Sequence, residues 1–266
     1  MGQSLGAQDQ KETAAEIFDR LFLPAMCTPW AIRVVEAARL APGDRVLDIA
    51  CGTGAVTAEA LRRVGPNGMV AGLDLNPEML AVARRKLPDL DWREGRAEAL
   101  PFQDDTFDAV LCQFGLMFFS DRDQAMREMR RVLRPGGRIV VAVWDRLERT
   151  PGYAALTHLV EQHLGLDAGK PIRDSFALGD VDLVRDLLEA AEISSVKAIS
   201  IEAKARFPSL QAWVDAEVRG WVGGGFIEEQ YGALVEDARR VLACYECPDG
   251  TAEFTLPAIV ATGSKT

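Results

Sequence analysis

The sequence is poor in the features that mark several common protein classes. It has only two histidines, no apolar leader segment, and no run that approaches the roughly 18 consecutive apolar residues of a transmembrane helix. Its five cysteines are an odd number, which argues against a complete disulfide framework. These absences predict a cytoplasmic protein that does not insert into a membrane.

A metal centre and a nucleic-acid surface are also not expected. Cys244 and Cys247 have the spacing of metal ligands, but a zinc site needs further ligands and no second cluster accompanies them. Acids outnumber bases by 40 to 30, and the net charge of −10 would repel a phosphate backbone. The predicted partner is therefore a small molecule, while the sequence leaves a monomer and a homodimer both open.

What the sequence does contain is a strand, a glycine loop and a helix at residues 46–61. An apolar run surrounds Asp48, and Gly52 and Gly54 then permit a tight turn and the close approach of a ligand. A dinucleotide loop would have a third glycine where this chain has Thr57, and a Walker loop would have a lysine, which is missing. Asp48 favours a ligand with a cationic end over a pyrophosphate.

A second acidic residue indicates a ribose. Residues 68–75 form a short apolar run around Asp74, which lies 20 residues after Gly54. In nucleotide-binding α/β folds, an acid at about this distance accepts hydrogen bonds from the ribose hydroxyls. The two segments together favour a ligand that joins a cationic group to a nucleoside.

Four short segments follow one another in order along the first part of the chain. They are Asp48-x-x-Cys51-Gly52-x-Gly54, Gly72-x-Asp74, the stretch 98–108 with Leu100-Pro101-Phe102 and Phe107-Asp108, and Leu133-Arg134-Pro135-Gly136-Gly137. Together they resemble the class I S-adenosylmethionine-dependent methyltransferases over about residues 15–145. The stretch 98–108 is similar to the ubiquinone/menaquinone branch and its small-molecule relatives. The resemblance implies S-adenosylmethionine as the cofactor.

The same resemblance implies which residues would contact that cofactor. Asp48 would lie near the methionine amino group, and Asp74 would bind the ribose. Arg96 departs from the family pattern, in which an acid often meets the adenine amino group, because arginine has only donors. The Ala97 N–H and the Glu98 carboxylate would serve instead. The full implied set is Asp48, Ala50, Gly52, Gly54, Asp74, Leu75, Met79, Arg96, Ala97, Glu98 and Gln113.

Alternating strand and helix patterns predict an α/β fold, a doubly wound and mostly parallel seven-stranded sheet with an antiparallel last strand. The strands are expected at 45–50, 69–74, 90–94, 107–112, 137–144, 193–206 and 251–263, with helices at 55–64, 78–87 and 121–132. Pro257 lacks an amide donor and predicts either a bulge or a non-hydrogen-bonding position in the last strand. Residues 43–146 would form the cofactor-binding core, and 147–266 the rest of the core with helical insertions over the substrate.

The segments outside the core are expected to be helical caps. Residues 1–42 would form an N-terminal cap with helices at 12–23 and 30–40, broken at Pro24 and at Thr28-Pro29. Helical insertions are expected near 152–165, 180–191 and 208–247, with a break between the first two at Gly165, Gly169, Pro171 and Gly179. The three glycines at 223–225 are consistent with either the hinge of a lid or an ordinary loop.

No residue stands out as a catalytic base. His158 and His163 lie on different faces of an inserted helix, solvent exposure is favoured for both, and His158 is the first to test as a base. The sequence predicts O- or C-methylation of a small, fairly apolar metabolite by direct in-line displacement. One alternative is a non-catalytic protein that binds S-adenosylmethionine or S-adenosylhomocysteine. Another, a nicotinamide-dependent dehydrogenase, is disfavoured by Thr57 and by the lack of a Tyr-x-x-x-Lys pair.

Overall fold

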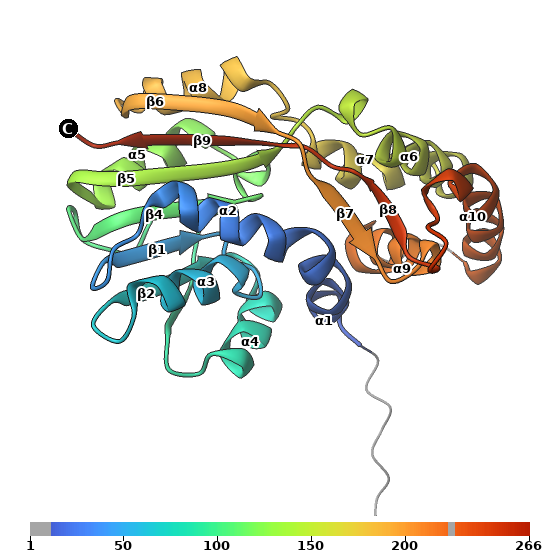
Figure 1. Ribbon diagram of the computed structural model, residues 1–266, viewed down its shortest axis with the longest axis horizontal. Coiled ribbons are helices and arrows are strands. Elements are labelled where there is room, and N and C mark those ends of the chain that lie inside the picture. The colour runs from blue at the N-terminus through green and yellow to red at the C-terminus, as the bar shows by residue number, and fades with distance from the viewer. Residues whose placement is uncertain (1–11, 223–226) are drawn as a thin grey trace, which may run out of the picture.

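The computed structural model describes residues 12–222 and 227–266 and has a seven-stranded sheet at its centre (Figure 1). The strand order is β3-β2-β1-β4-β5-β9-β6, parallel from β3 to β5, with β9 antiparallel to both β5 and β6. The predicted α/β fold and its antiparallel last strand are confirmed. The strands are β1 (Arg45–Ile49), β2 (Met69–Asp74), β3 (Asp91–Glu94), β4 (Phe107–Gln113), β5 (Leu133–Trp144), β6 (Ser194–Ile201) and β9 (Ala258–Ser264).

The helices between the first five strands begin where the sequence marks helix starts. Asn76 caps α4 (Pro77–Lys86) and Asp121 caps α5 (Arg122–Val132), each by accepting a backbone N–H at 2.9 Å. The third helix of this group, α3 (Ala55–Val64), starts directly after the glycine loop. All three helices lie within one residue of their predicted bounds.

The N-terminal region is one continuous helical run, and the prediction of two separate helices was wrong. α1 (Ala14–Ile17), the π-helical segment η1 (Phe18–Cys27) and α2 (Thr28–Ala38) follow without a break. Pro24 lies inside η1, and Thr28 is already helical and does not act as an N-cap. A π-helical turn interrupts the regular α-helical hydrogen bonds, so it tolerates a residue that has no N–H to donate.

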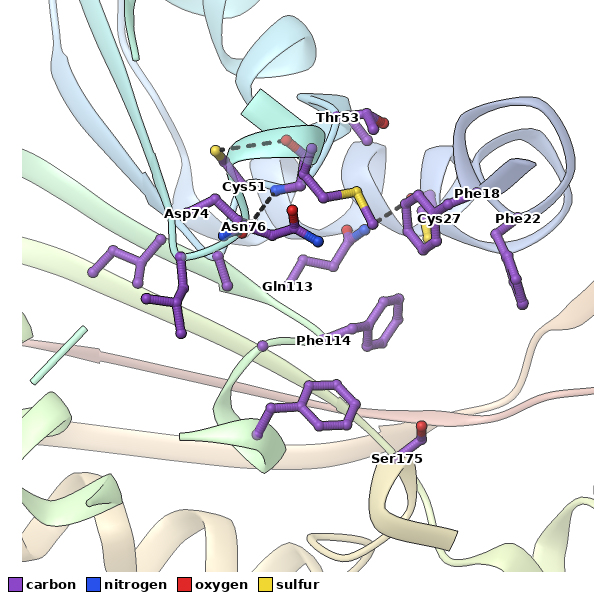
Figure 2. A pocket seen from close by; sticks show the side chains of 18 of the residues that line it. Phe18, Phe22, Cys27, Cys51, Thr53, Asp74, Asn76, Gln113, Phe114 and Ser175 are labelled. Atoms are coloured by element: carbon purple, nitrogen blue, oxygen red, sulfur yellow. Dashed lines mark hydrogen bonds between the residues drawn. The ribbon is translucent and has the colours of Figure 1, made fainter. Parts of the chain in front are cut away.

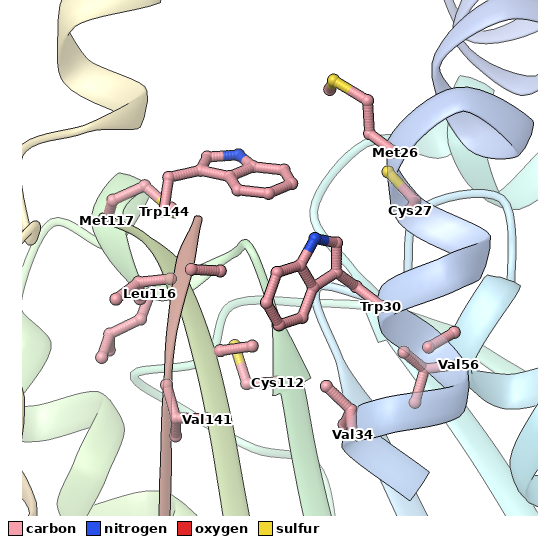
Figure 3. Packing of buried hydrophobic residues seen from close by; sticks show 14 of the residues in the cluster. Met26, Cys27, Trp30, Val34, Val56, Cys112, Leu116, Met117, Val141 and Trp144 are labelled. Atoms are coloured by element: carbon pink, nitrogen blue, oxygen red, sulfur yellow. The ribbon is translucent and has the colours of Figure 1, made fainter. Parts of the chain in front are cut away.

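This helical run is largely a core element. In the described ranges it is the one helix long and apolar enough to cross a membrane, but 56% of its most apolar 18-residue stretch is buried in the protein. Helices of a protein core pass the same test. Figure 3 shows Trp30 of α2 facing the end of β5, and its ring meets those of Phe114 and Trp144 edge-on at 6.1 and 6.3 Å.

The two C-terminal strands each divide in two, which the sequence did not predict. The strand expected at 193–206 forms β6 and then β7 (Lys204–Phe207), and the strand expected at 251–263 forms β8 (Ala252–Thr255) and then β9. β7 and β8 pair with each other as a separate two-stranded antiparallel sheet. Pro257 lies at the division between β8 and β9, where an interruption was expected.

The short sheet and the inserted helices form a cap beside the main sheet, on the right in Figure 1. The cap helices are α6 (Pro151–Leu164), α7 (Leu166–Ser175), α9 (Leu210–Asp215), η4 (Ala216–Val222) and α10 (Glu228–Val241). The expected helix end at Gly165 is confirmed, but the break expected at Gly169 and Pro171 was wrong, because α7 continues through both residues. It packs against both α6 and η4, and this tertiary packing outweighs its weak helix propensity. The following helix, α8 (Val181–Ala190), packs on β6 as part of the core. The three glycines at 223–225 lie outside the described residues.

Candidate active site

A large cavity opens between the cap and the carboxyl ends of the parallel strands. It holds about 1530 Å³ of space free of protein atoms, including the part open to solvent. Its lining comes from the N-terminal helical run, from the loops after β1, β2 and β4, and from the cap. Ligands of open α/β sheets bind at this edge, so the cavity lies where the glycine loop predicted a small molecule.

The loop after β1 has a backbone geometry that brings it close to its neighbours. Ala50 and Gly52 have positive φ angles of 55° and 54°. A β-carbon on Gly115, in the loop after β4, would lie 2.4 Å from that of Ala50, so a glycine is required for the two loops to meet. On the other side, Gly52 donates its N–H to Asp74 Oδ2 at 2.8 Å (Figure 2). Three loops thereby form one wall of the cavity.

Asp74 is fixed at the end of β2 by two backbone amides. Its Oδ2 accepts from Gly52 and its Oδ1 accepts from Asn76, each at 2.8 Å. Burial raises the pKa of the Asp74 carboxyl, and these hydrogen bonds offset part of the rise. Each carboxylate oxygen has a second lone pair, so this group can also accept hydrogen bonds from a ligand.

Asp48 is the more deeply buried acid of this wall, with 1% of its surface exposed. The Thr57 hydroxyl donates to Asp48 Oδ2 at 2.6 Å. Burial raises the pKa of Asp48 to about 7, while the Thr57 hydrogen bond acts to lower it. The sequence argument used Thr57 only to exclude a dinucleotide loop, and it missed that this hydroxyl holds the neighbouring acid. A cationic group beside Asp48 would favour the ionised carboxylate.

The residues expected around the adenine also reach the cavity. It is lined by Leu75, Met79, Arg96, Ala97 and Glu98. Arg96 donates to the Ser120 hydroxyl at 2.8 Å, and Glu98 Oε1 accepts from the Ser120 amide at 2.9 Å. Burial acts to raise the pKa of Glu98, but hydrogen bonds from backbone amides outweigh it and the net shift is downward. Glu98 is therefore the charged acceptor of this region, and Arg96 is engaged with Ser120.

Two further members of the implied set have different surroundings. Gly54 is not part of the lining, and a β-carbon there would lie 2.9 Å from the Trp92 ring, so its place is in the packing behind the wall. Gln113 does line the cavity, and its Nε2 donates to the Cys27 carbonyl at 3.0 Å (Figure 2). Gln113 Oε1 and the Thr53 hydroxyl are buried without a hydrogen-bond partner in the described chain. Unpartnered polar atoms on a cavity wall mark positions where a polar ligand can bind.

The part of the cavity toward the cap is aromatic. Its aromatic lining residues are Phe18, Phe22, Phe114, Phe118, Phe119, Trp144, Tyr153, Phe176 and Trp221. Phe114, which projects into the cavity in Figure 2, stacks on Trp144 with ring centroids 3.5 Å apart. Phe118 and Trp221 meet with centroids 5.4 Å apart. Such walls favour a flat or apolar molecule over a highly charged one.

One acid lies among these aromatic residues, and the sequence analysis missed it. Glu217 of η4 is 2% exposed and lines the cavity, and the Tyr153 hydroxyl of α6 donates to its Oε1. Burial raises the pKa of Glu217 to about 8, against a lowering effect of the Tyr153 hydrogen bond. A signal was present in the sequence, since Glu217 follows the buried Trp213 by one helical turn and therefore lies on its face.

Neither histidine lines the cavity. His158 is exposed on α6, so the expected solvent exposure is confirmed and its position does not support a role as base. His163 is half-buried, so the exposure expected for it was wrong, and its Nε2 lies 2.9 Å from Asp237 Oδ2 of α10. Within the described residues, no group of three or more His, Cys, Asp or Glu side chains is arranged to hold a metal ion.

Comparisons with known proteins agree with this geometry. A family model described as a methyltransferase domain matches residues 47–141. The ubiquinone/menaquinone biosynthesis C-methyltransferase UbiE of Hahella chejuensis is 46% identical over 123 residues, which is 44% of this chain and 49% of that protein. The chain thus spans about half the length of this relative. The enzyme of the same name from Escherichia coli O1:K1 / APEC is 33% identical over 190 residues, which is 65% of this chain and 76% of that protein.

A solved methyltransferase structure has a similar fold. The putative methyltransferase from an antibiotic biosynthesis pathway of Anabaena variabilis matches 87% of this chain and 96% of its own, with a TM-score of 0.64 and 19% identity. The matched domain covers β1, β2 and β4, whose loops form the acidic wall of the cavity, and the Escherichia coli relative is matched over three quarters of its length. This chain therefore belongs to the class I S-adenosylmethionine-dependent methyltransferases and resembles their ubiquinone/menaquinone C-methyltransferase members.

Proposed function

We propose that the protein transfers a methyl group from S-adenosylmethionine to oxygen or carbon of a small, fairly apolar acceptor. The observation that carries the proposal is the division of one cavity into two parts. The part at the strand ends has the acids Asp48, Asp74 and Glu98, and the part toward the cap is aromatic. A charged nucleoside donor and an apolar acceptor would each meet a suitable wall.

The donor wall fits the cofactor by its chemistry. Asp74 is anchored by two amides and keeps lone pairs for the ribose hydroxyls, and Asp48 would face the ammonium group. The adenine would lie between Leu75, Met79 and Ala97, with Glu98 as acceptor for its amino group. The buried, unpartnered oxygens of Thr53 and Gln113 would gain hydrogen-bond partners from the polar end of the ligand. Ala50 and Gly52 would shape the loop around the methionine part.

The reaction makes modest demands on the protein. The bound cofactor supplies a methyl group that is already activated on a sulfonium. The residues of this chain have to hold the acceptor in line with that group and to exclude water, and positioning of this kind can supply about 7–11 kcal/mol. The aromatic wall suits both tasks. The non-catalytic alternative rested on Arg96 and on the lack of a base, and Glu217 is a candidate for that base.

Isothermal titration calorimetry of the purified chain with S-adenosylhomocysteine tests the proposal. We expect binding at one site per chain, with micromolar or tighter affinity and competition by S-adenosylmethionine. Mass spectrometry of aromatic and apolar acceptors incubated with S-adenosylmethionine would then detect products heavier by one methylene. A chain that binds neither S-adenosylmethionine nor S-adenosylhomocysteine would refute the proposed function.

A further inference from the structure

The acceptor side of the cavity contains a carboxyl and a phenol that are buried together. Glu217 and Tyr153 are 2% and 3% exposed, and the Tyr153 hydroxyl donates to Glu217 Oε1. Among the described residues, Tyr153 is the one hydrogen-bond partner of this carboxyl, and no Lys, Arg or His forms an ion pair with it. A buried acid without a counter-charge is destabilising for a fold, so its presence on a cavity wall points to a function there.

The pair lies next to the methyl-donor end of the cavity. The Tyr153 hydroxyl is 3.2 Å from Met26 Sδ, and the adjacent Cys27 carbonyl accepts the Gln113 amide at 3.0 Å. One turn of η1 therefore contacts both the Glu217–Tyr153 pair and the residue that ends β4. Met26, Cys27 and Gln113 all line the cavity together with the pair. An acceptor held against Glu217 would thus border the part of the cavity assigned to the donor.

We propose that Glu217 is the general base of the methyl transfer, that Tyr153 is its positioning residue, and that the acceptor carries a hydroxyl of phenolic acidity. This inference rests on the proposed function. The acceptor hydroxyl would donate to Glu217 Oε2, since Oε1 already accepts from Tyr153. As the acceptor oxygen bonds to the methyl carbon, its proton passes to Glu217 and the electron pair of the carbon–sulfur bond stays on sulfur. The products are the methyl ether, S-adenosylhomocysteine and a protonated Glu217.

The aromatic lining around Glu217 suits an aromatic hydroxyl, and the raised pKa of the base fits the acidity of such a group. The pKa of Glu217 is raised to about 8 by burial, and a phenol has an ordinary pKa of about 10, so a proton can move between them as the bond forms. An aliphatic alcohol is far too weak an acid for this exchange. A neutral phenol also avoids the cost of burying a cation among the aromatic side chains of this wall.

Few other charges act on the pair. Tyr153 and Cys27 line the same cavity beside Glu217, and burial raises the pKa of both. The other titratable side chains of the lining, Asp48, Cys51, Asp74, Arg96 and Glu98, belong to the wall at the strand ends. The charged side chains of the elements packed against η4 are paired with other residues or exposed. Glu16 of α1, Asp19 and Arg20 of η1, Lys170 and Arg173 of α7 and Asp215 of α9 pair with Arg85, Lys86, Glu12, Asp174, Glu161 and Arg219, respectively, and Asp167 of α7 is exposed.

The test measures the binding of 4-methylphenol to the chain saturated with S-adenosylhomocysteine, by calorimetry between pH 6 and 9. The probe stays largely neutral in this range, and an ionised carboxylate accepts its hydrogen bond more strongly than a neutral one. We expect its affinity to rise about 5-fold with a half-point near pH 8. In Glu217→Gln the affinity should be weak and independent of pH. 4-Methylanisole, which has no proton to donate, should bind both proteins equally.

Two variants separate catalysis from structure. Tyr153→Phe removes the hydrogen bond that lowers the pKa of Glu217, so the half-point should move to higher pH. A residue that only filled space would not move it. Asp215→Asn is the matched control, because Asp215 also accepts a tyrosine hydroxyl, that of Tyr231, but does not line the cavity. It should leave the half-point unchanged.

The experiment distinguishes a failure of the base assignment from a failure of the proposed function. S-adenosylhomocysteine is titrated first, and Glu217→Gln should bind it within about twofold of the unaltered chain, since the two sites are distinct. If the chain binds S-adenosylhomocysteine but 4-methylphenol does not bind, or binds Glu217→Gln equally well, Glu217 is not the base. Tighter binding of 4-methylbenzylamine that depends on Glu217 would overturn the phenolic acceptor in favour of an amine.

Discussion

The donor wall and the acceptor wall face the same cavity but are built in opposite ways. The donor wall is polar, and its acids are held by backbone amides and a hydroxyl at most 23 residues away, such as Gly52 for Asp74 and Thr57 for Asp48. The acceptor wall is aromatic, and its acid is held across 64 residues by Tyr153. A family that shares one cofactor and many acceptors would keep the first wall constant and vary the second. Substitutions in the donor wall should therefore change cofactor binding, and substitutions in the acceptor wall should change the titration of Glu217.

The largest effect should appear in the pH dependence of the unfolding free energy. Each wall has one buried acid, Asp48 or Glu217, whose pKa is raised in the folded state. Burial raises the pKa of Glu217 from 4.5 to about 8 and that of Asp48 from 3.8 to about 7. The folded state therefore keeps protons that the unfolded state has lost, and stability falls as the pH rises from about 4.5 to 8. We expect the ligand-free protein to lose several kcal/mol of unfolding free energy between pH 5 and pH 9.

Urea denaturation at a series of pH values measures this loss. Glu217→Gln should remove the part of the slope that extends to about pH 8, and Asp48→Asn the part that ends near pH 7. The exposed Glu229→Gln is the control and should leave the slope as it is. If neither Glu217→Gln nor Asp48→Asn changed the slope of unfolding free energy against pH, the two buried acids would behave like surface carboxyls and the prediction would be wrong.

Asp74→Ala should have the next largest effect, and it should be confined to the donor wall. Two hydrogen bonds from ribose to a charged group, each worth roughly 1.5–3 kcal/mol, predict at least a 100-fold loss of S-adenosylhomocysteine affinity. Calorimetry would measure it, with Asp91→Ala on the exposed end of β3 as the control. Affinity retained in Asp74→Ala would show that the ribose is bound elsewhere.

Thr57→Val should have a smaller effect on the same wall. The hydroxyl donates to Asp48 at 2.6 Å, and its loss would leave a buried oxygen with one partner fewer. We expect about a 10-fold weaker affinity for S-adenosylhomocysteine and a further rise in the pKa of Asp48, visible as weaker binding at lower pH. Thr57→Ser keeps the hydroxyl and should restore most of the affinity. Equal weakening in Thr57→Val and Thr57→Ser would show that the hydroxyl does not account for the lost affinity.

His158→Ala should have the smallest effect. The side chain is exposed on α6 and does not line the cavity. We expect cofactor affinity, probe affinity and unfolding free energy to stay near those of the unaltered chain, because exposed substitutions commonly change stability by less than about 0.5 kcal/mol. Loss of probe binding in this variant would mean that α6 moves to bring His158 into the site.

The sequence was a good guide to the donor wall because its signals are local. A strand that ends in Asp48, a glycine loop and a helix start are features of neighbouring residues, and the sheet then brings such loops to one edge. The same logic identified Asp74. It failed for Gly54, which packs against Trp92 of β3, because that contact depends on a strand far along the chain.

The cap was predicted poorly because tertiary packing decides its structure. Pro24 and Pro171 are helix breakers by propensity, yet both lie inside helices that pack against other elements of the cap or core. The C-terminal strands were expected to be continuous, and each divides where the chain leaves the main sheet for the cap. Propensity amounts to about 3 kcal/mol for a proline, which several buried side chains can outweigh.

The sequence by itself determined the fold class, the family and the wall that would hold the donor, because these depend on hydrophobic period, turn residues and short motifs. Only the tertiary structure revealed the acceptor wall. Tyr153 and Glu217 lie in different inserted helices, and nothing local in either helix specifies its partner. Their meeting depends on how two helices pack over the sheet, and the burial that raises the pKa of Glu217 exists only in the folded chain.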